Sequence, residues 1–145
     1  MKVAAAMLCD FAQVRDGLLT VVSAGVTRIF ADQMPASLTV FLALQVALSD
    51  EESRLPHEIE VRITGPSAQE IATARGGFQV GSIAEVDEET IASLPFDFRA
   101  AAVPEFGWYT WTIAIDSVSV AQLRARVERR TTTASPSRSG SPKPH

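Results

Sequence analysis

Apolar and charged side chains alternate at every second residue between positions 57 and 63. The apolar set is Ile59, Val61 and Ile63, and the charged set is Glu58, Glu60 and Arg62. A β-strand with one face in the core and the other in water has this period, whereas a helix repeats every 3.6 residues. The segment therefore predicts a half-buried strand, and it constrains the fold more than any other feature of the chain.

The same period recurs along the chain. Between Leu38 and Leu48 one face is entirely Leu and Val and the other is only weakly polar, which predicts a central strand covered on both faces. Shorter alternating runs occupy positions 96–99 and 123–127. In the run from Trp108 to Asp116 one face is predicted to be core, and it consists of Tyr109, Trp111, Ile113 and Ile115.

These runs are short, rich in β-branched and aromatic residues, and bounded by turn-forming residues. They predict an all-β fold, namely an antiparallel β-sandwich of immunoglobulin-like or Greek-key type, with about seven to nine strands and at most one short helix. The stretch Ala84–Ser93, which Pro95 would end, favours that helix. It is interpreted as a solvated crossover between sheets, with an acidic docking surface as the alternative.

Glycines mark the predicted turns. Asp16-Gly17 lies between two apolar runs and predicts a hairpin with arms Val3–Val14 and Leu18–Ser23, since glycine adopts a positive φ freely. Gly25 is expected at a bulge or kink where the chain bends toward Val26–Phe30. The pair Gly76-Gly77 is also expected to mark a bulge within a strand.

Composition divides the chain into a domain over residues 1–127 and a Ser-, Thr-, Pro- and Arg-rich tail over 128–145, expected to be disordered. The formal net charge of −4 argues against nucleic acid as the main partner. Every apolar stretch is shorter than the roughly 18 residues that span a bilayer. We therefore expect a cytoplasmic protein that does not bind membranes.

Residues that could carry chemistry are few. The histidines are His57 and His145, and the one cysteine, Cys9, lies in an apolar run and is expected to be a buried, inert thiol. His and Cys spacing does not suit zinc, and no cofactor is predicted. Weak calcium binding by Glu51-Glu52 and Asp87–Glu89 is a minor alternative. We predict that the protein is not an enzyme; only a cluster of carboxylates around His57 would favour catalysis.

The residues most suited to contact a ligand or partner are Phe106 and Trp108, because Trp108 lies on the face opposite the predicted core. The leading hypothesis is a protein-binding or assembly module that uses a sheet face or an edge strand, with self-association included. The alternative is a small-ligand or carbohydrate-binding domain built around Trp108 and nearby loops.

Three segments resemble one family. In Leu8–Ile29 the residues Asp10, Ala12, Gln13, Val14, Gly17 and Leu18 match the opening Asp-x-Ala-Gln-Val-x-x-Gly-x-Leu of small, mainly actinobacterial proteins that form a domain of unknown function. Residues 76–81 and 106–116 resemble its middle and late strands. The resemblance implies a cytosolic β-sandwich and supplies no catalytic residue.

Overall fold

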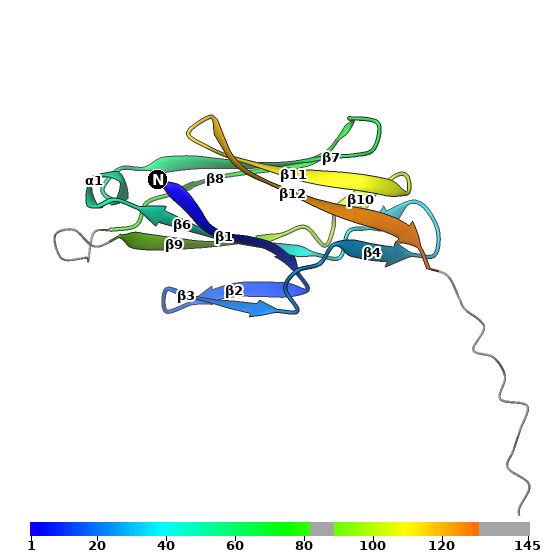
Figure 1. Ribbon diagram of the computed structural model, residues 1–145, viewed down its shortest axis with the longest axis horizontal. Coiled ribbons are helices and arrows are strands. Elements are labelled where there is room, and N and C mark those ends of the chain that lie inside the picture. The colour runs from blue at the N-terminus through cyan, green and yellow to red at the C-terminus, as the bar shows by residue number, and fades with distance from the viewer. Residues whose placement is uncertain (82–88, 131–145) are drawn as a thin grey trace, which may run out of the picture.

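The computed structural model describes residues 1–81 and 89–130, and nearly all of its regular structure is β-strand (Figure 1). The elements in chain order are β1 (Lys2–Cys9), β2 (Phe11–Arg15), β3 (Leu18–Val22), β4 (Arg28–Ala31), β5 (Ala36–Ser37), β6 (Phe41–Leu48), α1 (Asp50–Ser53), β7 (His57–Thr64), β8 (Glu70–Phe78), β9 (Thr90–Asp97), β10 (Ala102–Val103), β11 (Gly107–Ile115) and β12 (Val118–Arg129).

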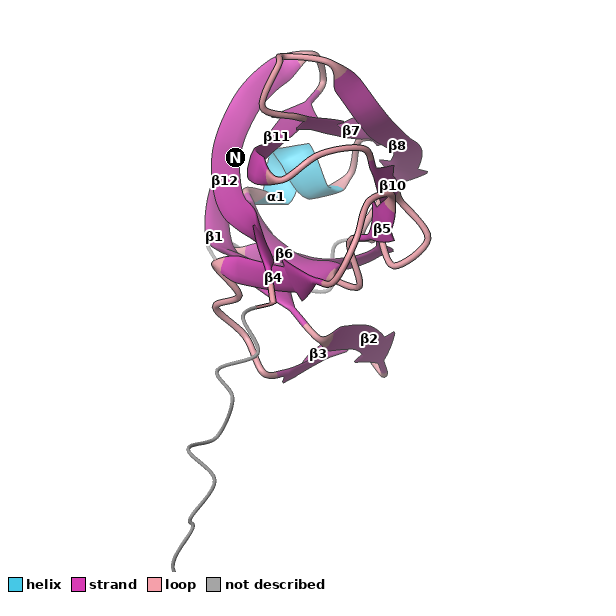
Figure 2. Ribbon diagram, turned by 90° about the vertical axis from the view of Figure 1, so that its right-hand side faces the viewer, coloured by secondary structure: helices cyan, strands magenta, loops and turns pink. Residues whose placement is uncertain are grey.

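Two main sheets enclose the core. One has the order β1-β6-β9 and the other β4-β12-β11-β7-β8, and the two-stranded pairs β5–β10 and β2–β3 complete the fold. Seen end-on in Figure 2, the strands curve around a common interior, with β1 beside β12 on one side and β5–β10 on the other. One core cluster draws on both sheets, and its largest fully buried side chains are Trp111, Tyr109, Leu38, Leu42 and Leu44.

The burial of side chains in the structure follows the alternation of apolar and polar residues in the sequence. In β11 the residues Tyr109, Trp111, Ile113 and Ile115 are all buried, whereas Trp108 is exposed. In β6 both faces are buried except at Gln45, as expected for a strand covered on both sides. The all-β class is therefore confirmed, and the immunoglobulin-like type stays a prediction.

Several finer predictions are wrong. The described residues form 12 strands rather than seven to nine, because the chain breaks into short pieces at turns and bends. The sheets are not wholly antiparallel, since β12 pairs with β4 in parallel. The positive φ of Thr39 (58°) interrupts the strand predicted from Leu38, so β6 begins at Phe41.

The one short helix among the described residues is α1, within residues 49–56, whose turn-like composition predicts a connection rather than a helix. Ser49 and Glu52 form a capping box that satisfies the backbone at its start. Residues 90–93 of the predicted helix belong to β9, where pairing with β6 overrides the local spacing, and residues 84–88 lie outside the described residues.

The described residues contain no helix that is long and apolar enough to cross a membrane, and a cytoplasmic location stays a prediction.

The predictions made from the glycines are confirmed at the Asp16-Gly17 turn and wrong at Gly76-Gly77. Asp16 (φ 53°) and Gly17 (φ 75°) form the two-residue loop of the β2–β3 hairpin, which is confirmed. Its first arm is shorter than predicted, because a bend at Asp10 separates β1 from β2. Gly25 has a positive φ of 89°, consistent with the predicted kink before β4. Gly76-Gly77 is not a bulge, since both residues keep regular register with β7.

The β2–β3 hairpin forms a third layer below the three-stranded sheet (Figure 1). Its inner side covers the outer face of that sheet through a second buried cluster of Cys9, Ala12, Phe41 and Ala43. The Phe11 and Phe41 rings meet edge to face at 5.2 Å between centroids. This layer explains why both faces of β6 are buried.

Candidate functional site

His57 is held between two acceptors at the end of the fold that contains α1. Its Nδ1 lies 2.6 Å from Asp116 Oδ2, and its Nε2 lies 2.6 Å from the Glu52 carbonyl oxygen. Asp116 also accepts a hydrogen bond from the Glu58 backbone N–H through Oδ1. The three contacts tie together α1, the start of β7 and the turn between β11 and β12.

These contacts favour a charged imidazole. A backbone carbonyl only accepts, so Nε2 carries a proton, and an ionised Asp116 accepts from the proton on Nδ1. The hydrogen bonds to Asp116 and to Glu52 raise the pKa of His57 above its usual value. The bond from His57 correspondingly lowers the pKa of Asp116. Both contacts therefore favour the charged form of His57 paired with ionised Asp116.

Ser117, His57 and Asp116 are the residue types of a hydrolase triad, but their arrangement differs from one. In a triad the ring nitrogen not facing the carboxylate accepts the proton of the nucleophile. Here that nitrogen donates to the Glu52 carbonyl, and the ring is only 6% exposed. The imidazolium has no free lone pair with which to act as a general base. The contacts support a structural role for His57.

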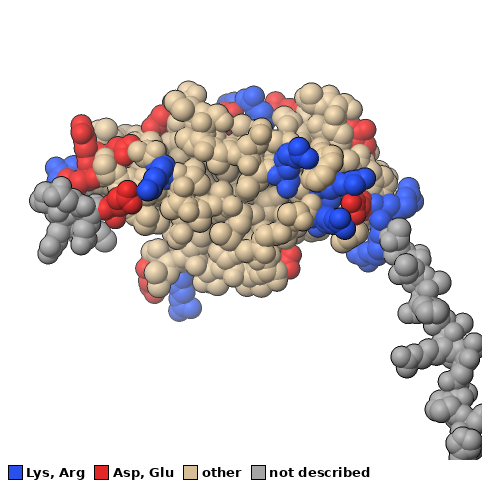
Figure 3. All heavy atoms as spheres, viewed as in Figure 1, with Lys and Arg blue, Asp and Glu red and all other residues tan. Residues whose placement is uncertain are grey.

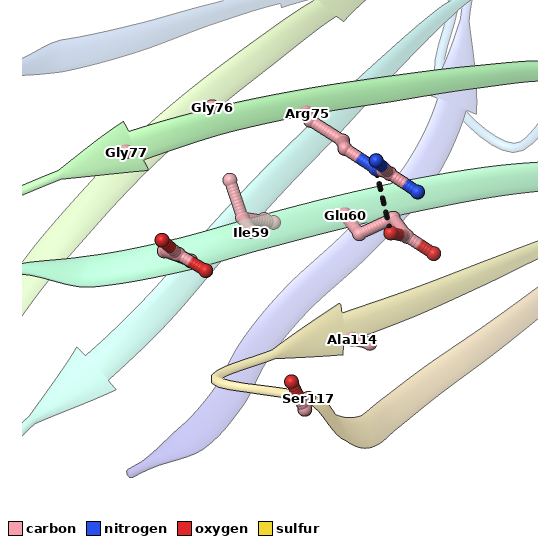
Figure 4. A pocket seen from close by; sticks show the side chains of 8 residues that line it. Ile59, Glu60, Arg75, Gly76, Gly77, Ala114 and Ser117 are labelled. Atoms are coloured by element: carbon pink, nitrogen blue, oxygen red, sulfur yellow. Dashed lines mark hydrogen bonds and ion pairs between the residues drawn. The ribbon is translucent and has the colours of Figure 1, made fainter.

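A shallow groove of about 690 Å³ lies beside this ion pair, along the ends of β7, β8 and β11 (Figure 4). Gly76 and Gly77 provide no side chains there, which leaves the groove open. Two of its three charged side chains are paired with each other, since Arg75 Nε lies 2.9 Å from Glu60 Oε2 and the third is Glu58. The groove offers space, backbone and one further carboxylate, and none of these defines a particular ligand.

Trp108 and Phe106, the predicted contact residues, lie at the opposite end of the five-stranded sheet from α1. Trp108 is 45% exposed, and the Arg124 guanidinium lies 4.3 Å from its ring. Phe106 is half-buried, and the Arg129 guanidinium lies 5.1 Å from the centroid of its ring. Over residues 1–81 and 89–130 the two rings do not contact each other, and neither arginine has an acidic partner. Figure 3 shows Lys and Arg side chains gathered where β12 and β4 end.

The β2–β3 hairpin carries four of the ten exposed large apolar side chains among the described residues. They are Phe11, Val14, Leu18 and Val22, which are 38%, 40%, 73% and 47% exposed. In Figure 3 this lobe is mostly uncharged, with charged atoms near its two ends. Within the described chain, each strand of the hairpin pairs only with the other, so each has a free edge.

The remaining candidates carry no site. Cys9 is fully buried, and burial raises the pKa of its thiol, which confirms the prediction of a buried thiol. Among the described residues no group of three or more His, Cys, Asp or Glu side chains could hold a metal ion. Glu51 and Glu52 lie in α1, whereas Asp87 and Glu88 of the second calcium candidate lie outside the described residues.

Fold and surface together define a β-sheet protein with an appended apolar hairpin and an arginine-covered aromatic pair. A family of unknown function (DUF6941) matches residues 4–128, and the chain belongs to it. The predicted membership of an uncharacterised family is thereby confirmed. No curated protein matches the chain.

Two features of the structure were not predicted from the sequence, namely the contact between His57 and Asp116 and the exposure of the β2–β3 hairpin. The bond between His57 and Asp116 joins residues 59 positions apart, and local patterning carries no signal for it. The exposure of the hairpin had a signal, since residues 18–22 are apolar on both faces of a strand only five residues long. From its sequence that segment is assigned only as an arm of a hairpin, without a prediction about its exposure.

Proposed function

We propose that the protein is a non-enzymatic protein-binding module and that the β2–β3 hairpin is its contact surface. The observation that carries the proposal is a two-stranded layer with two free edges and four exposed large apolar side chains. Unpaired strand edges bind extended chains through backbone hydrogen bonds. Exposed apolar side chains add the area that such contacts need.

The hairpin is suited to this role because it is already ordered. An isolated two-stranded hairpin is marginally stable in water. Here Leu19 and Val21 pack against the second buried cluster, and Phe11 packs on Phe41, so the body of the protein fixes the hairpin in place. A partner strand would meet a preformed edge and would not have to order it.

A photo-reactive amino acid placed at Leu18 of the full chain, in its native cells, tests the proposal. Val118 is the matched control, because it is apolar and 64% exposed but lies on β12. We expect protein adducts from position 18 that are absent from position 118. Equal or absent adducts at the two positions would count against the hairpin as the contact surface.

We infer a Greek-key sandwich, and the support is Tyr109, the single tyrosine of the chain. Its hydroxyl donates to the Glu105 carbonyl at 2.6 Å, four residues upstream, at the start of β11. Tyrosine corners of this kind occur in immunoglobulin-like sandwiches.

A second candidate function is the binding of a small ligand around Trp108 and Phe106. The favouring observation is an exposed indole with a guanidinium that has no acidic partner among the described residues. An anionic ligand with an apolar or planar part suits that pair. Tryptophan fluorescence of the native chain and of Trp108→Phe, titrated with anionic metabolites and glycans, tests it. A signal that is the same in both proteins would exclude Trp108.

A further inference from the structure

Strand β3 differs from the other edge strands in having no protection against pairing. Natural sheets place charges, prolines or very short strands at their edges to prevent association. Among the described strands longer than two residues, the other edges each carry a charged residue: Lys2 in β1, Arg15 in β2, Arg28 in β4, Glu70 in β8 and Asp97 in β9. Strand β3, Leu-Leu-Thr-Val-Val, has no charge, proline or glycine.

The register of the hairpin decides which groups of β3 are free. The two-residue loop closes on the pair Arg15–Leu18, which is therefore hydrogen-bonded. Bonded residues alternate along an antiparallel ladder, so Leu18, Thr20 and Val22 direct their N–H and C=O groups toward β2. The N–H and C=O groups of Leu19 and Val21 point to the open edge.

The sequence of β3 is self-complementary about its middle residue. In an antiparallel pair of two β3 strands centred on Thr20, Leu18 faces Val22 and Leu19 faces Val21 of the other copy. Leu19 and Val21 then form the hydrogen-bonded pairs, and each outward N–H and C=O of both strands finds a partner. The two Thr20 side chains, both exposed, face each other across the two-fold axis.

We propose that the occupant of the β3 edge is a second copy of this chain, paired antiparallel about Thr20 in a two-fold symmetric dimer. This rests on the proposed function of the hairpin as a contact surface. The pairing joins two hairpins into a four-stranded layer and brings Leu18, 73% exposed, against Val22, 47% exposed, of the other copy. A two-fold contact is closed, so association stops at the dimer.

Oxidative cross-linking of Thr20→Cys in the full chain tests the register. The native Cys9 is fully buried and does not compete. Opposed Thr20 positions lie within disulfide range, about 4.5 Å between Cα atoms. The matched control is Gln13→Cys, exposed on the same hairpin but one strand further out, where the two copies are roughly 14 Å apart. With oxidised glutathione we expect a covalent dimer from the first variant and at most traces from the second.

A charge introduced at position 20 provides an independent test, in which the dimer fraction is measured by sedimentation. Thr20→Lys or Thr20→Glu alone places like charges opposite each other and weakens dimerisation by about tenfold, whereas an equimolar mixture restores it. Equal cross-linking of the two cysteine variants, or a charge variant that dimerises like the native chain, would overturn the proposal. If position 18 still yields adducts with other proteins, self-pairing alone has failed and the contact surface stands.

Discussion

Replacing Asp116 by asparagine removes the charge that His57 contacts and leaves the shape of the side chain almost unchanged. Asparagine tolerates the positive φ of this position (50°), so the turn between β11 and β12 is preserved. The amide oxygen can still accept from the Glu58 N–H, as Oδ1 does now. The amide nitrogen cannot accept from the Nδ1–H of a charged His57.

A hydrogen bond to a charged group contributes about 1.5–3 kcal/mol, and removing it leaves the imidazolium without its counter-charge. Asp116 is 45% exposed, so solvent screens the pair, and the lower end of that range applies. We expect Asp116→Asn to lower the free energy of unfolding by about 1.5 kcal/mol. For a chain of this size that shifts the urea midpoint by roughly 0.5–1 M.

The loss depends on pH with a definite sign. The pKa of His57 is raised in the folded state, so its contribution is fully present below the unfolded value of 6.5 and disappears as pH rises through the folded pKa. The pKa of Asp116 is lowered, so its contribution is present above 3.8 and disappears as pH falls through the folded value. The two proteins should therefore differ most between these limits and converge in alkali.

Urea unfolding of both proteins from pH 4 to 9 measures this difference. Asp97→Asn is the control. Arg99 Nη2 lies 2.8 Å from Asp97 Oδ2, but this pair is exposed and therefore contributes little to the free energy of unfolding. Equal stability of Asp116→Asn and the native chain at pH 5–6, or a difference that grows above the folded pKa of His57, would refute the ion-pair assignment.

Three further predictions concern single side chains. Ser117→Gly, at an exposed turn position with φ 68°, should raise the free energy of unfolding by about 0.5–1 kcal/mol in thermal melts, and an unchanged midpoint would contradict the strain. Tyr109→Phe should lower it by about 1–2 kcal/mol in urea, because the Glu105 carbonyl loses its buried donor; a neutral substitution would show that water replaces the hydroxyl. Cys9 should react with a thiol reagent only at the rate of opening of the protein, and fast modification of the native chain would contradict its burial.

Most strands of this fold could be predicted because burial on one side of a sheet imposes an alternation that is visible in the sequence. The inward face of β11 is an example, and the Asp16-Gly17 turn could be predicted separately because glycine adopts a positive φ freely. The parallel pairing of β4 with β12 could not be predicted in this way, since it depends on tertiary neighbours about 100 residues apart. Helix α1 had a local signature, the capping box Ser49-x-x-Glu52, which the turn-like composition concealed.

The surface could be predicted only in part. The alternation of faces along β11 predicts that Trp108 is exposed to solvent, and the structure confirms this. That Arg124 covers its ring follows from the register of β11 with β12, which no single strand reveals. The placement of β2–β3 as an outer layer depends on how Phe41 and Ala43 are covered. The pattern within one strand thus predicts which of its side chains are exposed. Contacts between different elements can be known only from the three-dimensional fold.

Amide hydrogen exchange along β3 tests most directly whether this strand is an open edge. At high dilution the amides of Leu18, Thr20 and Val22 should be protected by their bonds to β2, whereas those of Leu19 and Val21 should exchange rapidly. At high concentration Leu19 and Val21 should become protected together. Uniform protection of all five amides at every concentration would mean that the edge is already covered within one chain, and uniform rapid exchange would mean that the hairpin is not formed.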